Sequence, residues 1–164
     1  MSRLYLAGPL FSEAELAFNR EIRDLLKESF DVYLPQEDGG LMVDMIKNGM
    51  SFVEAQHLVF LSDIGAIRRA DYLLIILDGR SVDEGASFEL GFAHALGKKC
   101  IGYQSDPRRL LPVGNNPMVE CALETILTSR SELLMWAGQE SEAHQPSRLN
   151  KDRSDVPAGS PYRL

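Results

Sequence analysis

Apolar and polar positions alternate along the chain in blocks that predict strands and helices in turn. Short apolar runs at 3–7 and 31–35 are typical of buried strands, and each is followed by a turn containing glycine or proline. Between them, Ser12 is expected to cap a helix, because Glu15 follows at the capping-box spacing. An apolar stripe at helical spacing then predicts that this helix continues to about Glu28.

The middle of the chain contains its most apolar segment. Residues 72–77 (YLLIIL) are apolar at every position, as a central parallel strand covered by helices on both faces must be. The glycine- and methionine-rich stretch 36–50 is expected to be partly helical, and 51–69 is expected to be helical up to the strand. After a loop at 78–86, we expect a helix at about 87–97.

The last part of the pattern predicts one more strand, one more helix and a polar tail. The strand is KKCIGYQ (98–104), and Asn116 is expected to cap a helix that has Pro117 at its first position. The alternation of strands and helices favours a single doubly wound α/β domain of the flavodoxin or Rossmann type, with a mostly parallel sheet flanked by helices. We place this domain at 1–137. The polar tail at 138–164 would be disordered on its own, and the ways to order it are docking on the body or on a neighbouring subunit.

Composition narrows the class of partner. A chain of 164 residues with 45% hydrophobic content can bury one core, and its net charge of −7 makes DNA and RNA poor partners. Cys100 and Cys121 lie in apolar surroundings without metal-ligand spacing, so we expect reduced thiols in a cytoplasmic protein. No apolar segment approaches the roughly 18 residues of a membrane span, so no membrane partner is expected.

Candidate chemistry gathers where the predicted strands end, which is where open parallel sheets bind ligands. YLAGPLF carries Tyr5 and Gly8, LDGRSVDEGASFELG carries Asp83 and Glu89, and a polar loop occupies 103–116. Neither GxGxxG nor GxxxxGK[ST] is present, which excludes the common dinucleotide and P-loop motifs. No metal-ligand spacing is present either, and we expect no metal and no cofactor.

Each of these side chains also has a structural explanation. Glu89 near a helix N-terminus would stabilise the helix by about 0.3–1 kcal/mol, and Asp83 would be a solvated loop charge. Tyr5 in a buried strand would be a core residue with its hydroxyl bonded to backbone, and Asn116 would be a helix cap. Asp71 lies at the starting end of the central strand, away from the expected cleft, unless it belongs to the preceding helix.

Four segments, taken together, favour a catalytic interpretation of these residues over the structural one. They are LYLAGPLF, ADYLLIILDG, DEGASFELGFAHALGKK and NNPM. In combination they resemble the nucleoside 2-deoxyribosyltransferase family over residues 3 to about 127. The resemblance implies an enzyme that transfers 2-deoxyribose between nucleobases by double displacement, through a covalent glycosyl-enzyme. It favours the catalytic interpretation of Glu89 over the structural one.

The resemblance implies a role for each matching position. Glu89 matches the nucleophile that attacks the anomeric carbon, and Tyr5 matches the tyrosine whose hydroxyl holds that carboxylate in place. Asp71 matches the aspartate that handles the proton of the departing and arriving base. The substrate-binding matches are Asp83 near the 5′-hydroxyl, Asn116 reaching from an adjacent subunit, Leu10 and Phe11 against the base, and Gly8 in the turn before them.

The chemistry explains why these residue types are needed. Breaking an N-glycosidic bond passes through an oxocarbenium-like state, which a carboxylate stabilises and then traps as an ester. The base must also receive a proton, so one carboxyl group must be ionised while another is protonated. Two displacements at one carbon give net retention. Transfer instead of hydrolysis requires that water is kept out while the bases exchange.

The implied partners are deoxynucleosides, free nucleobases and further copies of the chain, in a homo-oligomer of two to six subunits with shared active sites. One alternative is an N-glycoside hydrolase of deoxynucleosides or deoxynucleoside 5′-monophosphates. A phosphate binder needs Ser, Arg or backbone amides near the 5′ end, whereas Asp83 places a carboxylate there, which favours transfer between free nucleosides. A third possibility is a non-catalytic flavodoxin-like module that only binds a ligand or partner.

Overall fold

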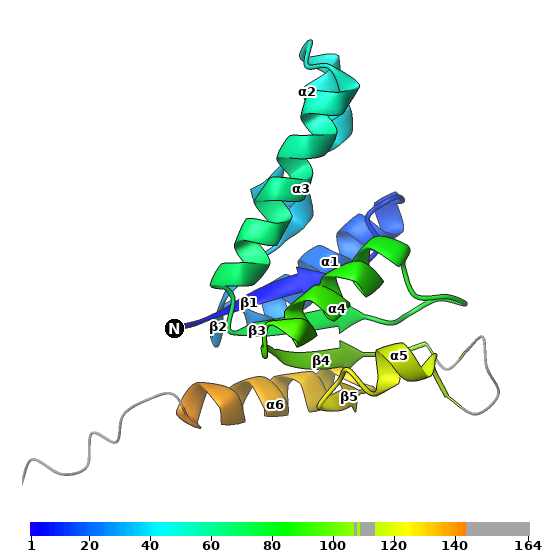
Figure 1. Ribbon diagram of the computed structural model, residues 1–164. Coiled ribbons are helices and arrows are strands. Elements are labelled where there is room, and N and C mark those ends of the chain that lie inside the picture. The colour runs from blue at the N-terminus through cyan, green and yellow to red at the C-terminus, as the bar shows by residue number, and fades with distance from the viewer. Residues whose placement is uncertain (107, 109–113, 144–164) are drawn as a thin grey trace, which may run out of the picture.

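The computed structural model describes residues 1–106, 108 and 114–143. These residues form a five-stranded, all-parallel sheet in the order β2-β1-β3-β4-β5, the flavodoxin-like order that the sequence predicted (Figure 1). The strands are β1 (Ser2–Ala7), β2 (Phe30–Tyr33), β3 (Tyr72–Ile76), β4 (Lys99–Tyr103) and β5 (Thr125–Leu127).

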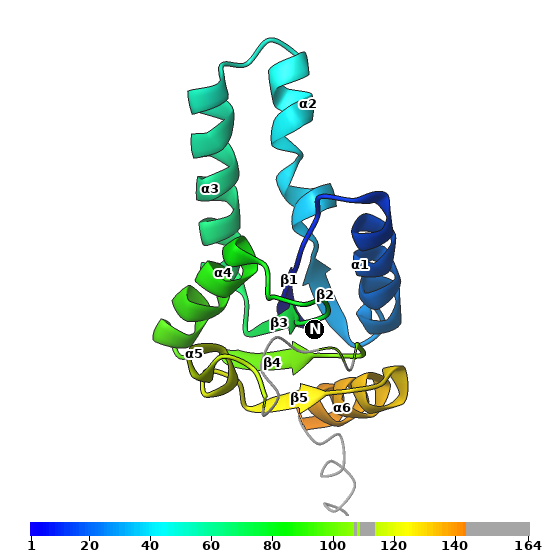
Figure 2. The ribbon, with the colours of Figure 1, turned by 90° about the vertical axis from the view of Figure 1, so that its right-hand side faces the viewer.

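Helices cover both faces of this sheet (Figure 2). One face is covered by α1 (Glu13–Leu26) and α6 (Arg130–Ala143). The other is covered by α3 (Phe52–Arg69), α4 (Glu84–Ala95) and α5 (Pro117–Glu120). A π-helical turn, η1 (Pro35–Gly39), and the short α2 (Met42–Lys47) lead into α3. The helices α2 and α3 extend together away from the sheet as a hairpin (Figure 1).

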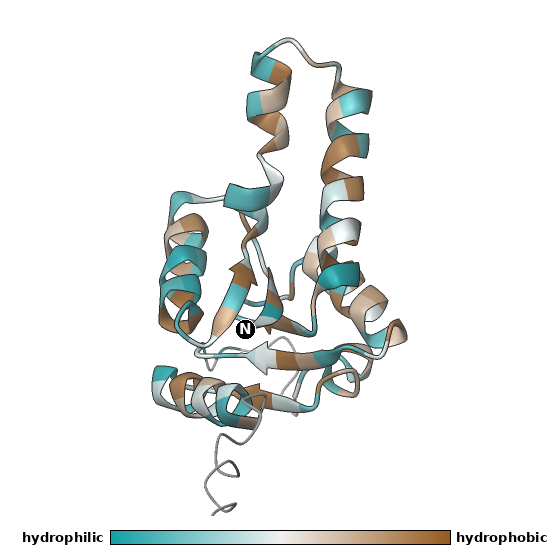
Figure 3. Ribbon diagram, turned by 90° about the vertical axis from the view of Figure 1, so that its left-hand side faces the viewer, coloured by the Kyte–Doolittle hydropathy of each residue, from teal (hydrophilic) through white to brown (hydrophobic). Residues whose placement is uncertain are grey.

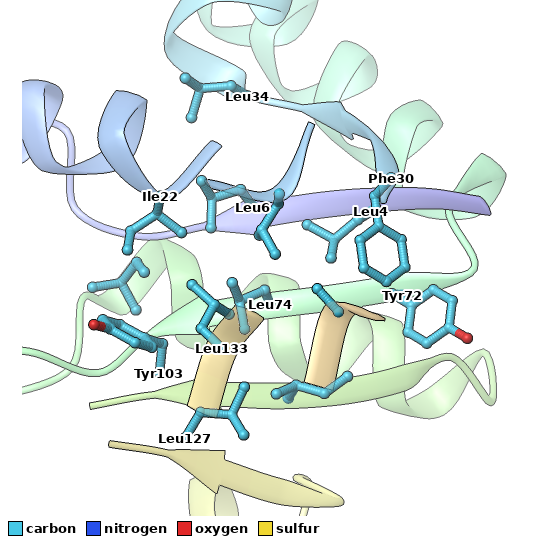
Figure 4. Close-up of a cluster of buried hydrophobic side chains, with 14 residues drawn as sticks. Leu4, Leu6, Ile22, Phe30, Leu34, Tyr72, Leu74, Tyr103, Leu127 and Leu133 are labelled. Atoms are coloured by element: carbon cyan, nitrogen blue, oxygen red, sulfur yellow. The ribbon is translucent and has the colours of Figure 1, made fainter. Parts of the chain in front are cut away.

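The central strand β3 explains why two cores form. All of its residues are buried, and alternate side chains point to opposite faces. Leu74 and Ile76 join the cluster under α1 and α6, which Figure 4 shows, whereas Leu73 and Ile75 join the cluster under α3 and α4. Burial of each side chain of this size contributes about 1.5–3 kcal/mol to the free energy of folding. The apolar run YLLIIL therefore stabilises β3 at the centre of the sheet.

Three boundaries differ from the predictions. The helix expected at 87–97 begins at Glu84, because the carboxylate of Asp83 accepts a hydrogen bond from the Ala86 amide at 2.8 Å and caps it. The helix that Asn116 caps is only one turn long, and β5 follows it. The last helix continues past residue 138 to Ala143, and the rest of the expected tail lies outside the described residues.

The two cysteines also differ from one another. Both are free thiols, and Cys100 is buried in β4 as expected. Cys121 is exposed, because it follows the single turn of α5 at the surface. Among residues 1–106, 108 and 114–143, no helix combines the length and the apolar character needed to cross a membrane.

Hydrophobic residues recur along the helical hairpin of α2 and α3 (Figure 3), and several of them are exposed. The most exposed on α3 include Val53, Phe60 and Leu61, and Phe88 of α4 is also half exposed. The rings of Phe60 and Phe88 lie 6.3 Å apart, so the apolar surface runs from α3 onto α4. Solvated apolar surface of this kind is typical of an interaction face.

Candidate active site

The centre of the site is a hydrogen bond between Tyr5 and Glu89. The Tyr5 hydroxyl donates to Glu89 Oε1 at 2.6 Å, which is at the short end of the range for O–H···O hydrogen bonds. Tyr5 comes from β1 and is fully buried, and Glu89 comes from α4. Ala86 and Leu90 pack α4 against the sheet. The Glu89 carboxylate is therefore positioned both by its helix and by the hydrogen bond from Tyr5.

The structural explanation of Glu89 does not fit its position. Since α4 begins at Glu84, Glu89 lies in the second turn, beyond the first turn in which a carboxylate benefits from the helix dipole. Burial, together with the charges of Asp63 and Asp83, raises the pKa of Glu89 to about 8, although the hydrogen bond from Tyr5 acts in the opposite direction. A carboxyl group with this pKa is typical of a functional site.

A second carboxyl group, Asp63 of α3, belongs to the same cluster. Burial raises its pKa to about 6, and the hydroxyl of Tyr33 donates to Asp63 Oδ1 at 3.4 Å. The charge of Asp63 is one of those that raise the pKa of Glu89. Both pKa values are raised and that of Glu89 is the higher, so near neutral pH the proton that the two groups share rests mainly on Glu89 and must move to Asp63 before Glu89 can attack. Between about pH 6 and 8 the pair therefore carries one proton.

The sequence did not single out Asp63, although a signal was present. Asp63 lies four residues before the buried Ile67, so a carboxylate occupies the helix face that packs against the sheet. A charged residue on an apolar helix face is unusual unless it is paired or functional.

The structure places Asp71 away from this cluster. Asp71 directly precedes β3 at the amino edge of the sheet, and its Oδ2 accepts a hydrogen bond from the Arg3 backbone amide at 2.9 Å. The Asp71 amide in turn donates to the Arg3 carbonyl at 2.9 Å. Asp71 is exposed and extends the pairing of β1 with β3, so it is not brought together with Glu89.

The turn after β1 lies at the carboxyl edge of the sheet, as predicted. A side chain at Gly8 would come within 3.1 Å of Ile76, so glycine allows the turn to pass close to β3. Leu10 is partly buried, and Phe11 is 79% exposed. Both residues follow Tyr5 on the same edge of the sheet, which is compatible with contact to a bound base.

Asp83 and Asn116 each cap a helix and face the region around α4. The charge of Asp83 contributes to the raised pKa of Glu89, which places it in the same electrostatic environment. The Asn116 side chain accepts a hydrogen bond from the Met118 amide at 2.9 Å and lines a cavity of about 280 Å³ with Arg80 and Ser87. Glu89 is not among the residues that line this cavity.

The chemical groups of the site are carboxyl groups and tyrosine hydroxyls. Across the described ranges 1–106, 108 and 114–143, no group of three or more His, Cys, Asp or Glu side chains is arranged to hold a metal ion. Carboxyl groups of this kind can transfer protons, and an ionised carboxylate can act as a nucleophile.

The fold and this cluster define a flavodoxin-like domain with two buried carboxyl groups next to a tyrosine. The chain belongs to the nucleoside 2-deoxyribosyltransferase family, whose model matches residues 4–147. A conserved protein from Enterococcus faecalis V583 shares 27% identity with it, covering 85% of this chain and 99% of that chain, with a TM-score of 0.65.

Two solved enzymes share the fold at lower identity. A 2-deoxyribosyltransferase from Bacillus psychrosaccharolyticus is 23% identical, covering 81% of this chain and 90% of that chain, with a TM-score of 0.66. The CMP N-glycosidase BcmB from Clostridium botulinum is 20% identical, covering 85% of this chain and 99% of that chain, with a TM-score of 0.53. The uncharacterized protein UU063 from Ureaplasma parvum is 30% identical over 99 residues, which are 58% of this chain and 61% of that protein.

Proposed function

We propose that this protein transfers 2-deoxyribose between nucleobases by two displacements at the anomeric carbon of a deoxynucleoside. The observation that carries the proposal is the buried Tyr5–Glu89 pair with Asp63 as a second carboxyl group beside it. In the first step a Glu89 oxygen bonds to C1′, the C1′–N bond breaks, and the departing base takes a proton from Asp63. In the second step the new base attacks C1′, the ester to Glu89 breaks, and Asp63 takes a proton from the new base.

Tyr5 keeps the nucleophile in place throughout both steps. Burial, and then the neighbouring charge of Glu89, raises the pKa of Tyr5 far above its ordinary value. Its hydroxyl therefore stays protonated and remains a hydrogen-bond donor to Glu89. That bond favours the ionised form of Glu89 against the effect of burial, and the ionised form is the nucleophile.

We assign the acid and base role to Asp63 and not to Asp71. Asp63 acts electrostatically on Glu89, whereas Asp71 is bonded to the backbone of Arg3 at the opposite edge of the sheet. A pKa of about 6 lets Asp63 give up and regain a proton near neutral pH. The same positions support hydrolysis if water replaces the second base, so the carboxyl pair does not by itself select transfer.

Asp83 supports free deoxynucleosides as substrates. As the cap of α4 it places a carboxylate in the environment of Glu89, where we expect the 5′ end of the sugar. A 5′-hydroxyl can donate to this carboxylate, whereas a 5′-phosphate would be repelled by it. Asp83 therefore favours nucleosides over nucleotides as substrates.

One observation favours a second candidate, the hydrolysis of deoxynucleoside 5′-monophosphates. The 280 Å³ cavity beside α4 is lined by Arg80, Ser81 and Ser87, and these side chains suit a phosphate. Glu89 is not among the residues that line it, which is why we rank this candidate second. Direct comparison of the two substrate classes decides between them.

We also propose a homo-oligomer, from a dimer to a hexamer, in which Asn116 serves the site of a neighbouring subunit. Asn116 is exposed, and it lines a cavity whose lining does not include Glu89. Its neighbour Met118 is 83% exposed, and the half-exposed Phe60 and Phe88 extend the apolar surface near α4. Burying such side chains between subunits would also keep water from the glycosyl ester.

The test is to incubate the enzyme with deoxyinosine and either adenine or cytosine and to separate the products by chromatography. The proposal predicts hypoxanthine together with the deoxynucleoside of the added base, at catalytic amounts of enzyme. Release of hypoxanthine and free deoxyribose without a new nucleoside would indicate a hydrolase. A parallel reaction with deoxyinosine 5′-monophosphate would then report whether a phosphate is preferred.

A further inference from the structure

Tyr33 connects the two halves of the proposed site. It is the last residue of β2 and the register partner of Tyr5 in the parallel pairing of β1 with β2. Register partners point to the same face of a sheet. The two rings are stacked, with centroids 5.4 Å apart and planes 15° from parallel. The ring of Tyr33 therefore supports the side chain that holds Glu89.

The hydroxyl of Tyr33 contacts α3 through two neighbouring residues. It lies 2.9 Å from Ser62 Oγ and 3.4 Å from Asp63 Oδ1. An ionised carboxylate can only accept, so Tyr33 is the donor to Asp63, and Ser62 is then the donor to Tyr33. This polarity gives a directed chain from Ser62 through Tyr33 to Asp63.

The π-helical turn after β2 closes against the same contact. A β-carbon at Gly39 would come within 2.9 Å of the Tyr33 hydroxyl and 3.0 Å of Asp63 Oδ1. Distances this short exclude a side chain at this position unless the pair moves. The turn thus packs its backbone directly onto the contact between Tyr33 and Asp63, and π-helical turns of this kind are frequent at functional sites.

We propose that Tyr33 is a positioning residue for the reaction, whose hydroxyl orients Asp63 toward the base and whose ring fixes Tyr5 and hence Glu89. The inference rests on the proposed function. It gives Tyr33 the role of setting the position of the acid relative to the nucleophile. These two residues come from different helices, Asp63 from α3 and Glu89 from α4. If Tyr33 were only a core residue, its hydroxyl would matter for stability alone.

The two explanations differ in what they predict for the protonation of Asp63. The titratable groups that interact with Asp63 include Tyr5 of β1, Tyr33 of β2 and Glu89 of α4; Asp38 acts in turn on Tyr33, and Asp83 acts in turn on Glu89. Burial raises the pKa of Asp63, and the bond from Tyr33 lowers it. Removal of that bond should therefore raise the pKa of Asp63 above about 6 and leave the acid badly oriented.

The experiment compares Tyr33→Phe with Tyr72→Phe. Tyr72 is the matched control because its hydroxyl bonds Glu140 at 2.7 Å in the other core, and both variants keep the aromatic ring. Carbon-13 NMR of the aspartate carboxyl groups measures the pKa of Asp63 without turnover. Kinetics over pH 5 to 9 use deoxyinosine and, separately, 7-methyldeoxyguanosine, whose cationic base leaves without taking up a proton.

For Tyr33→Phe we expect a rise in the pKa of Asp63, a shift of the acid-side limb of the rate profile to higher pH, and a rate about 10- to 100-fold lower with deoxyinosine. The loss should be much smaller with 7-methyldeoxyguanosine, and Tyr72→Phe should resemble the wild type. Equal losses with both substrates and an unchanged pKa of Asp63 would overturn the inference. A wild type that cleaves neither nucleoside would instead overturn the proposed function, while the NMR titration would still test the contact.

Discussion

The hydroxyl of Tyr5 donates a 2.6 Å hydrogen bond to Oε1 of Glu89, joining the middle of β1 to the second turn of α4. This bond favours the ionised carboxylate, but burial and the nearby charges of Asp63 and Asp83 outweigh it and raise the pKa of Glu89 to about 8. The charge on Glu89 is therefore unfavourable in the free protein. A substrate that develops positive charge at C1′ would stabilise it, which is the direction catalysis requires.

The first prediction separates Asp63 from Asp71. Asp63→Asn should lower base exchange by about 10²- to 10⁴-fold, because the departing base loses its proton donor. Asp71→Asn should leave exchange within about threefold of the wild type, since it alters only bonds at the far edge of the sheet. Steady-state rates with deoxyinosine and adenine measure both. A large loss in Asp71→Asn with an active Asp63→Asn would reverse the assignment.

The second prediction concerns pH. Below about pH 6 both carboxyl groups are protonated, so Glu89 cannot attack, and above about pH 8 both are ionised, so Asp63 cannot protonate the base. We expect kcat/KM to follow a bell with its maximum near pH 7 and limbs near these values. A rate that keeps rising to pH 10 would show that no protonated carboxyl group is needed.

The third prediction links the site to stability. Glu89 has an ordinary pKa of 4.5 and a pKa of about 8 in the folded protein, so folding takes up a proton between these values. The wild type should lose stability as pH rises through this window, by an amount on the order of a few kcal/mol, whereas Glu89→Gln should lose only the smaller part that comes from Asp63, whose pKa is also raised. The Tm advantage of Glu89→Gln should grow by on the order of 5–10 °C from pH 5 to pH 9.

Thermal unfolding of both proteins across that range is the measurement. The variant also loses the carboxylate that accepts from Tyr5, so the informative quantity is the change in the Tm difference with pH. A Tm difference that stays constant from pH 5 to pH 9 would mean that Glu89 ionises with an ordinary pKa.

The fourth prediction tests the shared site. Glu89→Ala and Asn116→Ala chains should each be nearly inactive, because one lacks the nucleophile and the other lacks the residue that reaches a neighbouring subunit. Mixing them under conditions in which subunits exchange should restore part of the activity, since some sites then receive both intact residues. No recovery after proven subunit exchange, or full activity of a monomer in light scattering, would count against composite sites.

The fold could be predicted wherever local pattern and packing agree. The buried run of β3 and the capping box of Ser12 and Glu15 are strong local signals, and both elements form as expected. The three-residue β5 is too short for a periodic signal, and α6 owes its place to tertiary packing, with Trp136 stacked on Phe30 at 5.3 Å. Such contacts cannot be read from a local window of sequence.

The site could be predicted only in part, for the same reason. Resemblance brought Tyr5 and Glu89 together correctly as neighbours, and the structure shows their bond. The resemblance implied the acid role for Asp71, but β3 begins at Tyr72 and leaves Asp71 at the amino edge of the sheet, away from Glu89. Asp63 becomes visible only when α3 is packed on the sheet, because its burial and its contact with Tyr33 are properties of the tertiary structure.

The central claim is that Glu89 forms a covalent bond to the sugar. The most direct test uses a 2′-fluoro-arabino nucleoside, since fluorine destabilises the oxocarbenium-like state and slows breakdown of the ester. Peptide mass spectrometry after brief incubation should find the fluorinated sugar on the peptide that contains Glu89, with one equivalent of base released per site. Release of base with no adduct, or an adduct on Asp63, would contradict the account.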